Sequence, residues 1–264
     1  MTSSQKFKII SAFDGASPHY EAAAGLQRDV AGKLAERIGR LTINESPKLL
    51  EIGCGTGFLT KSLMPVMPTA NRLISDISPA MVDQCRAEMP VNSEAEFIVM
   101  DGEQPNITSG VASGVGGEFD LICASLVFQW FEDLEKSIAQ LTAMLRPGGH
   151  LAFATLVRGT FHEWHAVHQM FGLSAATPVF PSAATIDGYW PDAGIGSIEE
   201  EEILQTYDTA HDFLMTLKAI GATTPKHDHE PLPAGSLRRI LRHLDQQGSL
   251  TITYQVAYGM FTRQ

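Results

Sequence analysis

Short runs of apolar residues alternate along the first part of the chain with longer segments in which apolar residues recur at helical spacing. Runs of this length, bounded by glycine, proline or polar residues, are typical of buried strands. Five runs are therefore predicted to be strands: 47–52, 72–75, 95–100, 119–124 and 150–156. The segments 79–88 and 133–145 between them predict helices. Strands that alternate with helices form a parallel sheet covered on both faces, so the pattern predicts a doubly wound α/β fold.

Other segments flank this core of residues 47–156. Residues 17–41 predict an N-terminal helix, because apolar side chains recur at every fourth position from Leu26 to Ile38. Residues 157–245 predict helical insertions that include one further strand of the sheet. These insertions and the C-terminal end are assigned as follows: helices at 161–173, 210–220 and 235–244, and strands at 198–207 and 250–262. We expect a single domain over 1–264, with a mostly parallel sheet of seven strands and late insertions that form a lid.

Charge and hydropathy narrow the class of protein. The chain has 264 residues, of which 30 are acidic and 19 basic, giving a formal net charge of −11. General nucleic-acid binders are basic, so we expect no nucleic-acid partner. No apolar run approaches the ~20 residues that a membrane span needs, and the first residues lack the apolar segment of a secretion signal. The protein is therefore expected to be cytoplasmic and not to bind a membrane.

Neither the cysteines nor the histidines have the spacing of a metal site. Cys54, Cys85 and Cys123 are odd in number and far apart, which argues against a disulfide framework and a structural zinc site. The segment HEWHAVH at 162–168 places its histidines three residues apart, whereas the zinc motif H-E-x-x-H needs a spacing of four. We expect no bound metal.

A glycine-rich turn follows the first predicted strand and precedes a helix. Gly53, Gly55 and Gly57 allow a ligand to lie directly against the backbone at this turn. The dinucleotide fingerprint G-x-G-x-x-G would require glycine at position 58, which is Phe58, and no G-K-[ST] of a phosphate-binding loop follows. Glu51 ends the strand just ahead of the turn. An acid at this position suits a cationic ligand and repels a phosphate.

Three successive predicted strands end in an acid. Glu51 ends the first, Asp76 the second, and Asp101, followed by Gly102 and Glu103, the third. Ligands of open α/β sheets bind at the carboxyl ends of the strands, and a carboxylate there can accept hydrogen bonds from both hydroxyls of a ribose. The three acids therefore predict one binding site at this edge.

These motifs resemble those of the class I S-adenosylmethionine-dependent methyltransferases. LLEIGCGTGFLT, SDISPAMVDQCR, FIVMDGEQ, FDLICASLVFQWFEDL and LRPGGHLAFATL occur in the family's order and spacing over residues 49–156. The resemblance implies a Rossmann-like sheet that binds S-adenosylmethionine, with Asp76 at the ribose and Asp101 near the adenine amino group. It implies that these residues contact the cofactor: Arg28, Glu51, Gly53, Gly55, Asp76, Ile77, Met81, Asp101, Gly102, Glu103 and Ser125.

Flanking segments resemble one branch, the malonyl-acyl-carrier-protein O-methyltransferases of biotin synthesis. AFDGASPHYEAAAGLQRDVAGKL, FATLVRGTFHEWHAVHQM, TLKAIGAT and GSLTITYQVAYGMFTR carry this resemblance over nearly the whole chain. It implies that the enzyme esterifies the free carboxylate of a malonyl thioester at the start of the pimeloyl branch. The implied partner is an acyl carrier protein bearing the malonyl group, or malonyl-CoA, and we expect a monomer.

The resemblance also implies residues for chemistry and substrate binding. Tyr20 and Gln129 are expected to be catalytic residues, Tyr20 by leaning over the cofactor methyl group and hydrogen-bonding the reacting carboxylate. Carboxylic acids lose their proton near pH 4, so this carboxylate is already ionised and needs no strong general base. The residues expected to contact the substrate or its carrier are Trp130, Lys218, Arg238, Arg239 and Arg242.

The arginines belong to a predicted helix, 235–244, that has no acidic residue and carries its apolar residues on the opposite face. Such a basic face suits an acidic carrier protein, and the alternative is a surface that only keeps the protein soluble. Trp130 has the alternative of core packing, and Arg28 and Lys218 that of solvated surface cations.

Two other functions stay open on the sequence. One is a methyltransferase for another small carboxylic acid or a quinone-like substrate. The other is a regulatory module that binds the cofactor without catalysis, against which the three intact acids argue.

Overall fold

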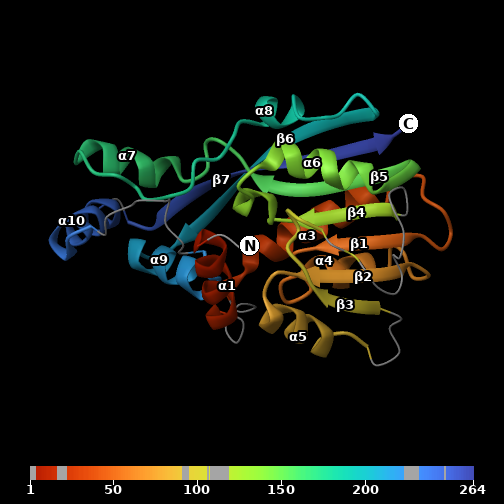
Figure 1. Ribbon diagram of the computed structural model, residues 1–264. Helices are drawn as coiled ribbons and strands as arrows, with labels where there is room; N and C mark the ends of the chain where they lie inside the picture. The colour runs from red at the N-terminus through yellow and green to blue at the C-terminus, as the bar shows by residue number, and fades with distance from the viewer. Residues whose placement is uncertain are drawn as a thin grey trace.

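The computed structural model describes residues 4–16, 23–90, 95–105, 107, 119–222, 232–246 and 248–264. Tyr20 lies outside the described residues. Seven strands form one sheet: β1 (Lys48–Ile52), β2 (Asn71–Asp76), β3 (Ala95–Val99), β4 (Phe119–Ser125), β5 (Leu145–Leu156), β6 (Gly194–Tyr207) and β7 (Leu250–Arg263). Their order is β3-β2-β1-β4-β5-β7-β6, and only β7 runs antiparallel to its two neighbours. The predicted α/β fold with a mostly parallel sheet is confirmed (Figure 1).

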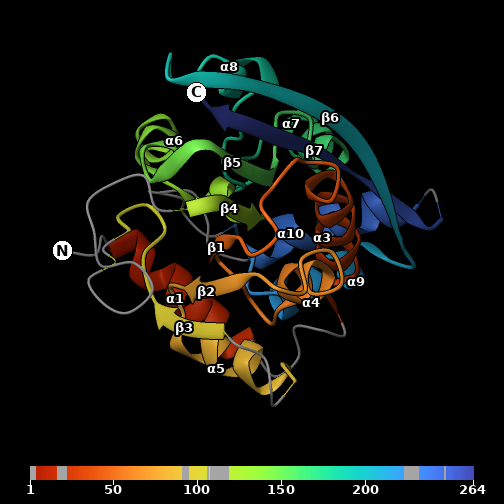
Figure 2. The ribbon, with the colours of Figure 1, turned by 90° about the vertical axis from the view of Figure 1, so that its right-hand side faces the viewer.

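Helices cover both faces of the sheet, as the alternation of strands and helices predicts (Figure 2). The described helices are α1 (Ser4–Ala16), α3 (Gly25–Ile38), α4 (Phe58–Leu63), α5 (Pro79–Ala87), α6 (Leu134–Ala143), α7 (His162–Met170), α8 (Ala183–Asp187), α9 (Ala210–Ala219) and α10 (Ala234–Asp245). Successive residues of β1 point to opposite faces: Leu49 lies in one buried cluster with Leu34 of α3, and Leu50 in another with Ile138 of α6. The central strands are therefore apolar on both sides, as parallel strands in such folds are.

The strands β6 and β7 extend past the carboxyl ends of β1, β2 and β4 (Figure 1). Helices α7, α9 and α10 gather around this extension, where α10 packs against both α7 and α9. Helix α1 lies beside α5 at the other side of the same edge. None of the helices in the described ranges is long and apolar enough to cross a bilayer.

Several boundaries differ from those predicted. The helix expected over 17–41 is described from Gly25 and ends at Ile38, and α1 was not predicted. Strand β6 begins at Gly194 rather than at residue 198, and β5 at Leu145 rather than at 150. Glycine disfavours strands, so the pattern gave no signal for the start of β6. Packing against β7 explains the glycine at this position, because a Cβ at position 194 would lie 2.3 Å from the ring of Phe261 on β7.

Candidate active site

The glycine turn after β1 has the backbone geometry that its sequence predicts. Gly53, Gly55 and Gly57 have φ angles of 67°, 52° and 93°, which other residues rarely adopt. A Cβ at Gly53 would lie 2.3 Å from Cγ2 of Val127, so the close approach of the loop after β4 also requires glycine there. A Cβ at Gly55 would meet nothing within 4 Å, and this glycine lines an open cavity.

The main cavity lies between the carboxyl ends of β1, β2 and β4 and the helices α1 and α9. Eight of the residues that the resemblance assigns to the cofactor line it: Gly53, Gly55, Asp76, Ile77, Met81, Asp101, Gly102 and Ser125. Gln129 and Trp130 line it as well. Glu51 instead lines a second, smaller cavity below the turn, which shares Gly53 and Gly55 with the main one.

Glu51 is buried beneath the glycine turn. Its Oε2 accepts a hydrogen bond of 2.7 Å from the hydroxyl of Thr60, whereas Oε1 has no hydrogen-bond partner within the part of the chain that the structure describes. Burial raises the pKa of this carboxyl to about 8. At neutral pH the carboxyl alone is therefore largely protonated, and a ligand that brings a positively charged group would favour its ionised form.

Asp76 ends β2 and faces the main cavity. Its Oδ2 accepts a hydrogen bond of 2.9 Å from the backbone N–H of Gly55, and its Oδ1 accepts one of the same length from Ser78. Burial raises the pKa of Asp76 to about 6, because these backbone donors only partly offset desolvation. The carboxylate is thus fixed against the glycine turn, with acceptor capacity left for a ligand.

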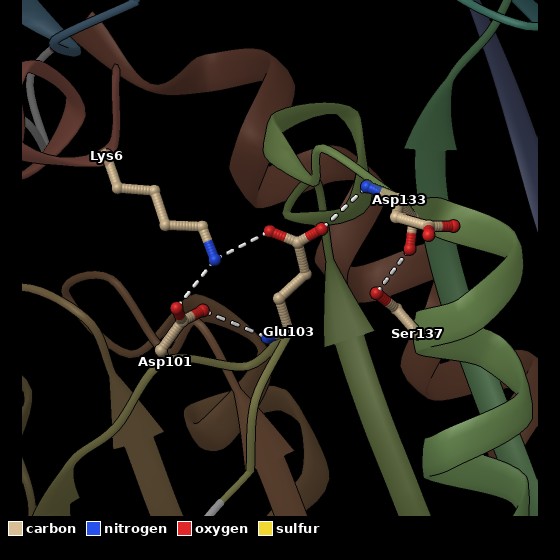
Figure 3. Close-up of polar contacts among 5 residues, drawn as sticks. All are labelled: Lys6, Asp101, Glu103, Asp133 and Ser137. Carbon is tan, nitrogen blue, oxygen red and sulfur yellow. Dashed lines mark hydrogen bonds and ion pairs between the residues drawn. The ribbon is translucent and has the colours of Figure 1, made fainter. Parts of the chain in front are cut away.

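Asp101 belongs to an ion-pair cluster with Lys6 of α1 and Glu103. The Lys6 ammonium lies 2.6 Å from Oδ2 of Asp101 and 2.6 Å from Oε2 of Glu103 (Figure 3). Asp101 and Lys6 line the main cavity, whereas Glu103 is buried and is not among the described residues that line it. The expected contact between Glu103 and the cofactor stays a prediction.

The loop after β4 brings Gln129 and Trp130 to the cavity. Both ends of the Gln129 amide are engaged: Nε2 donates to the carbonyl of Leu126 at 2.7 Å, and Oε1 accepts from the hydroxyl of Thr155 at 3.1 Å. Leu126 has a φ of 54°, so Gln129 stabilises an unusual turn next to the cavity. Trp130 packs edge-on against Phe13 of α1, with ring centroids 5.6 Å apart.

The cationic residues that were predicted to contact the cofactor or the substrate lie outside the main cavity. The Arg28 guanidinium is placed 5.0 Å from the ring centre of Phe58, while its neighbour Gln27 lines both cavities. Lys218 is exposed on α9, and the arginines of α10 are exposed on its outer face. Among the described residues, these cations do not line the main cavity, so their roles stay predictions.

Two groups of lining residues were missed in the sequence. Lys6, Ile9 and Phe13 come from α1. The four-residue spacing of Ile9 and Phe13 is the sequence signal that could have indicated this helix. Tyr254 comes from β7, whose antiparallel direction brings its first half to the edge where the parallel strands end. Its hydroxyl lies 2.9 Å from that of Tyr207 on β6, and burial raises the pKa of Tyr254 well above its usual value.

The histidines of 162–168 do not converge. His162 lies 3.2 Å from Glu163, the ring of His165 contacts the hydroxyl of Thr177 at 2.6 Å, and buried His168 contacts a backbone carbonyl of its own helix. In the part of the chain that the structure describes, no cluster of three or more His, Cys, Asp or Glu side chains is suited to a metal ion.

Comparison with known proteins agrees with this site. A family model described as a methyltransferase domain matches residues 50–151. In fold, the chain is similar to the YcgJ protein of Bacillus subtilis, with a TM-score of 0.62, 12% identity, and coverage of 89% of this chain and 98% of that one. It is likewise similar to the plantazolicin methyltransferase BpumL, with a TM-score of 0.55, 15% identity, and coverage of 98% and 97%.

Two relatives are similar in sequence over almost the whole chain. The biotin biosynthesis bifunctional protein BioCD of Bordetella avium is 44% identical over 97% of this chain, which spans about half (52%) of that protein. The malonyl-acyl-carrier-protein O-methyltransferase of Magnetococcus marinus is 38% identical, with coverage of 94% of this chain and 90% of that protein. The Magnetococcus marinus protein is 38% identical over most of both chains, and the glycine turn and the acids are in place. The chain therefore belongs to the family of malonyl-acyl-carrier-protein O-methyltransferases.

Proposed function

We propose that this protein transfers a methyl group from S-adenosylmethionine to the free carboxylate of a malonyl thioester held by an acyl carrier protein. In this proposal the reaction opens the pimeloyl branch of biotin synthesis. The observation that carries it is the convergence of the glycine turn and Asp76, joined by a 2.9 Å hydrogen bond, in a cavity that Asp101 also lines.

The residues present suit this cofactor. The unpaired Oε1 of Glu51 below the turn suits the ammonium of the methionine part, and Gly53 and Gly55 leave the backbone bare beside it. Asp76 suits the two ribose hydroxyls, and Asp101 the adenine amino group. The bound cofactor supplies an electrophilic methyl group on a sulfonium.

The chain's own contribution to the reaction is alignment and exclusion of water. The residues that line the cavity include the apolar side chains of Leu156, Phe161, Leu217 and Ile220. Such walls remove water from a carboxylate and so increase its reactivity toward the methyl group. Alignment of the carboxylate with the methyl group supplies the remaining rate acceleration. The carboxylate needs no base, because it is already ionised.

Labelled methyl transfer to three acceptors tests the proposal. Malonyl carrier protein, malonyl-CoA and free malonate are each incubated with the protein and S-adenosylmethionine. Malonyl carrier protein is expected to accept methyl fastest. Faster transfer to free malonate would favour a small-acid methyltransferase, and cofactor binding without transfer to any acceptor would favour a regulatory module.

Tyr254 is proposed to position the substrate carboxylate. Its raised pKa keeps the hydroxyl protonated, and with Tyr207 as the donor in their 2.9 Å contact the Tyr254 proton is left for an anion in the cavity. Tyr254→Phe is expected to raise KM for the malonyl thioester about ten-fold, the usual effect of losing a hydrogen bond to a charged group. Affinity for S-adenosylhomocysteine should stay unchanged by calorimetry. Tyr207→Phe is the matched control, because it removes only the outer hydroxyl, and an equal effect in both variants would contradict this role.

The roles of Tyr20 and Gln129 stay predictions within this proposal. Gln129 has one amide hydrogen beyond its bond to Leu126, which suits a second donor to the carboxylate. The expected monomeric state and cytoplasmic location also stay predictions.

A further inference from the structure

Lys6 is a buried cation at the edge of the cofactor cavity. Its side chain is 8% exposed, and its ammonium contacts both Asp101 and Glu103 at 2.6 Å (Figure 3). Burial alone would lower the pKa of Lys6, but hydrogen bonds to the two carboxylates outweigh it and raise the pKa. The side chain therefore carries its charge where two acids would otherwise repel each other.

Both acids are held on their other side by backbone donors. Oδ1 of Asp101 accepts from the N–H of Glu103 at 3.0 Å, and Oε1 of Glu103 accepts from the N–H of Asp133 at 2.7 Å. Asp133 is the N-cap of α6, and Ser137 donates to its carbonyl at 2.6 Å (Figure 3). Ion pairs and hydrogen bonds thus connect Lys6 on α1, through the two acids after β3, with the start of α6.

The rest of α1 also faces the cavity. Ile9 and Phe13 are three and seven residues beyond Lys6, share its helix face and line the cavity with it. Asp14, near the end of α1, accepts a hydrogen bond from Ser78 at the start of α5. By contrast Phe7 and Lys8 are exposed on the outer side. Helix α1 therefore forms a wall of the cavity, and polar contacts near both ends of the helix hold it in place.

We propose that Lys6 is a positioning residue of the cofactor site, which fastens α1 over the adenosine end and orients the Asp101 carboxylate toward the adenine amino group. This inference rests on the proposed binding of S-adenosylmethionine. Asp101 keeps free lone pairs after its bonds to Lys6 and to the backbone of Glu103, so it can still accept from an amino group. Loss of the ammonium would leave two neighbouring carboxylates, one of which would take up a proton or turn away.

Calorimetry with S-adenosylhomocysteine tests this role, with Lys6→Met compared with Lys8→Met on the exposed side of the same helix. Lys6→Met is expected to raise Kd by about ten-fold or more, the range for a lost charged hydrogen bond. The dissociation rate should rise with it, as most affinity changes do. Lys6→Arg keeps the charge and should restore most of the affinity, and Lys8→Met should match the native protein.

A second ligand separates orientation of Asp101 from a structural role. S-Inosylhomocysteine carries a carbonyl in place of the adenine amino group, so native protein should bind it more weakly. In Lys6→Met, and in Lys6→Gln if the first variant does not fold, the preference for the adenosine ligand should shrink. Equal losses for both ligands, or a Kd within two-fold of that of Lys8→Met, would overturn the inference. Absence of S-adenosylhomocysteine binding by native protein would instead overturn the proposed cofactor.

Discussion

Asp76→Ala is expected to weaken binding of S-adenosylhomocysteine by about ten-fold to more than one-hundred-fold while the fold stays intact. The carboxylate is proposed to accept both ribose hydroxyls, and hydrogen bonds to a charged group contribute roughly 1.5–3 kcal/mol. The substitution also releases the backbone N–H of Gly55, which Asp76 holds at 2.9 Å, and so loosens the glycine turn. Titration calorimetry measures the affinity, and circular dichroism checks the fold.

The matched control for this variant is Asp83→Ala on α5. Asp83 is exposed and pairs with Arg86 at 2.9 Å on the outer side of the helix, so its loss should leave the affinity unchanged. A folded Asp76→Ala protein that binds S-adenosylhomocysteine as tightly as Asp83→Ala would show that the ribose does not lie at this carboxylate.

The raised pKa of Asp76 gives the same contact a pH dependence. Burial moves this pKa to about 6, and the ionised form is the one that accepts both hydroxyls. Cofactor affinity is therefore expected to rise as pH increases through about 6 and to fall on the acid side. Asp76→Asn should bind weakly with no inflection near 6, which calorimetry between pH 5 and 7 would detect. An unchanged inflection in that variant would assign the titration to another group.

The parts of the fold that sequence predicts are those fixed by local pattern. Buried parallel strands appear as apolar runs, and an acid at or next to the end of each run falls at one edge of the sheet by topology. Asp76 and Asp101 at the main cavity, and Glu51 at the smaller one, could therefore be placed at the same edge. The contact of Lys6 with Asp101 joins residues 95 positions apart, and no periodicity encodes it. Tyr254 reaches the site only because β7 inserts antiparallel beside β5, which the alternating pattern of that strand does not reveal.

Burial sets Glu51 and Asp76 apart from ordinary surface carboxyls. Glu51 and Asp76 have raised pKa values because the sheet and the glycine turn remove them from water. Asp101 is more exposed, at 25% of its side chain, and has Lys6 as a counter-ion. The site therefore holds two desolvated carboxyls whose ionised forms a ligand with donors would stabilise, a pattern that favours binding over structural ion pairing.

The basic face of α10 is the proposed docking surface for the carrier protein. Ile240 and Leu244 are buried against the neighbouring helices, and Arg238 and Arg242 are exposed one turn apart on the other side. The Arg239 guanidinium lies over the ring of Phe171, 4.1 Å from the ring centre, so this contact already engages part of its charge. Acyl carrier proteins are acidic, and a chain of net charge −11 needs a local patch of opposite sign to attract one.

Reversal of two charges, Arg238→Glu with Arg242→Glu, is expected to raise KM for malonyl carrier protein by about ten-fold at low salt. The effect should fade in high salt, because screening weakens attraction between exposed charges. KM for malonyl-CoA should change much less, since that substrate shares the thioester but lacks the protein surface. Arg40→Glu with Lys136→Glu is the matched control, as it changes the net charge equally on exposed positions of α6 and of the segment after α3. Equal losses on both substrates, or an equal loss in the control, would show that α10 does not dock the carrier.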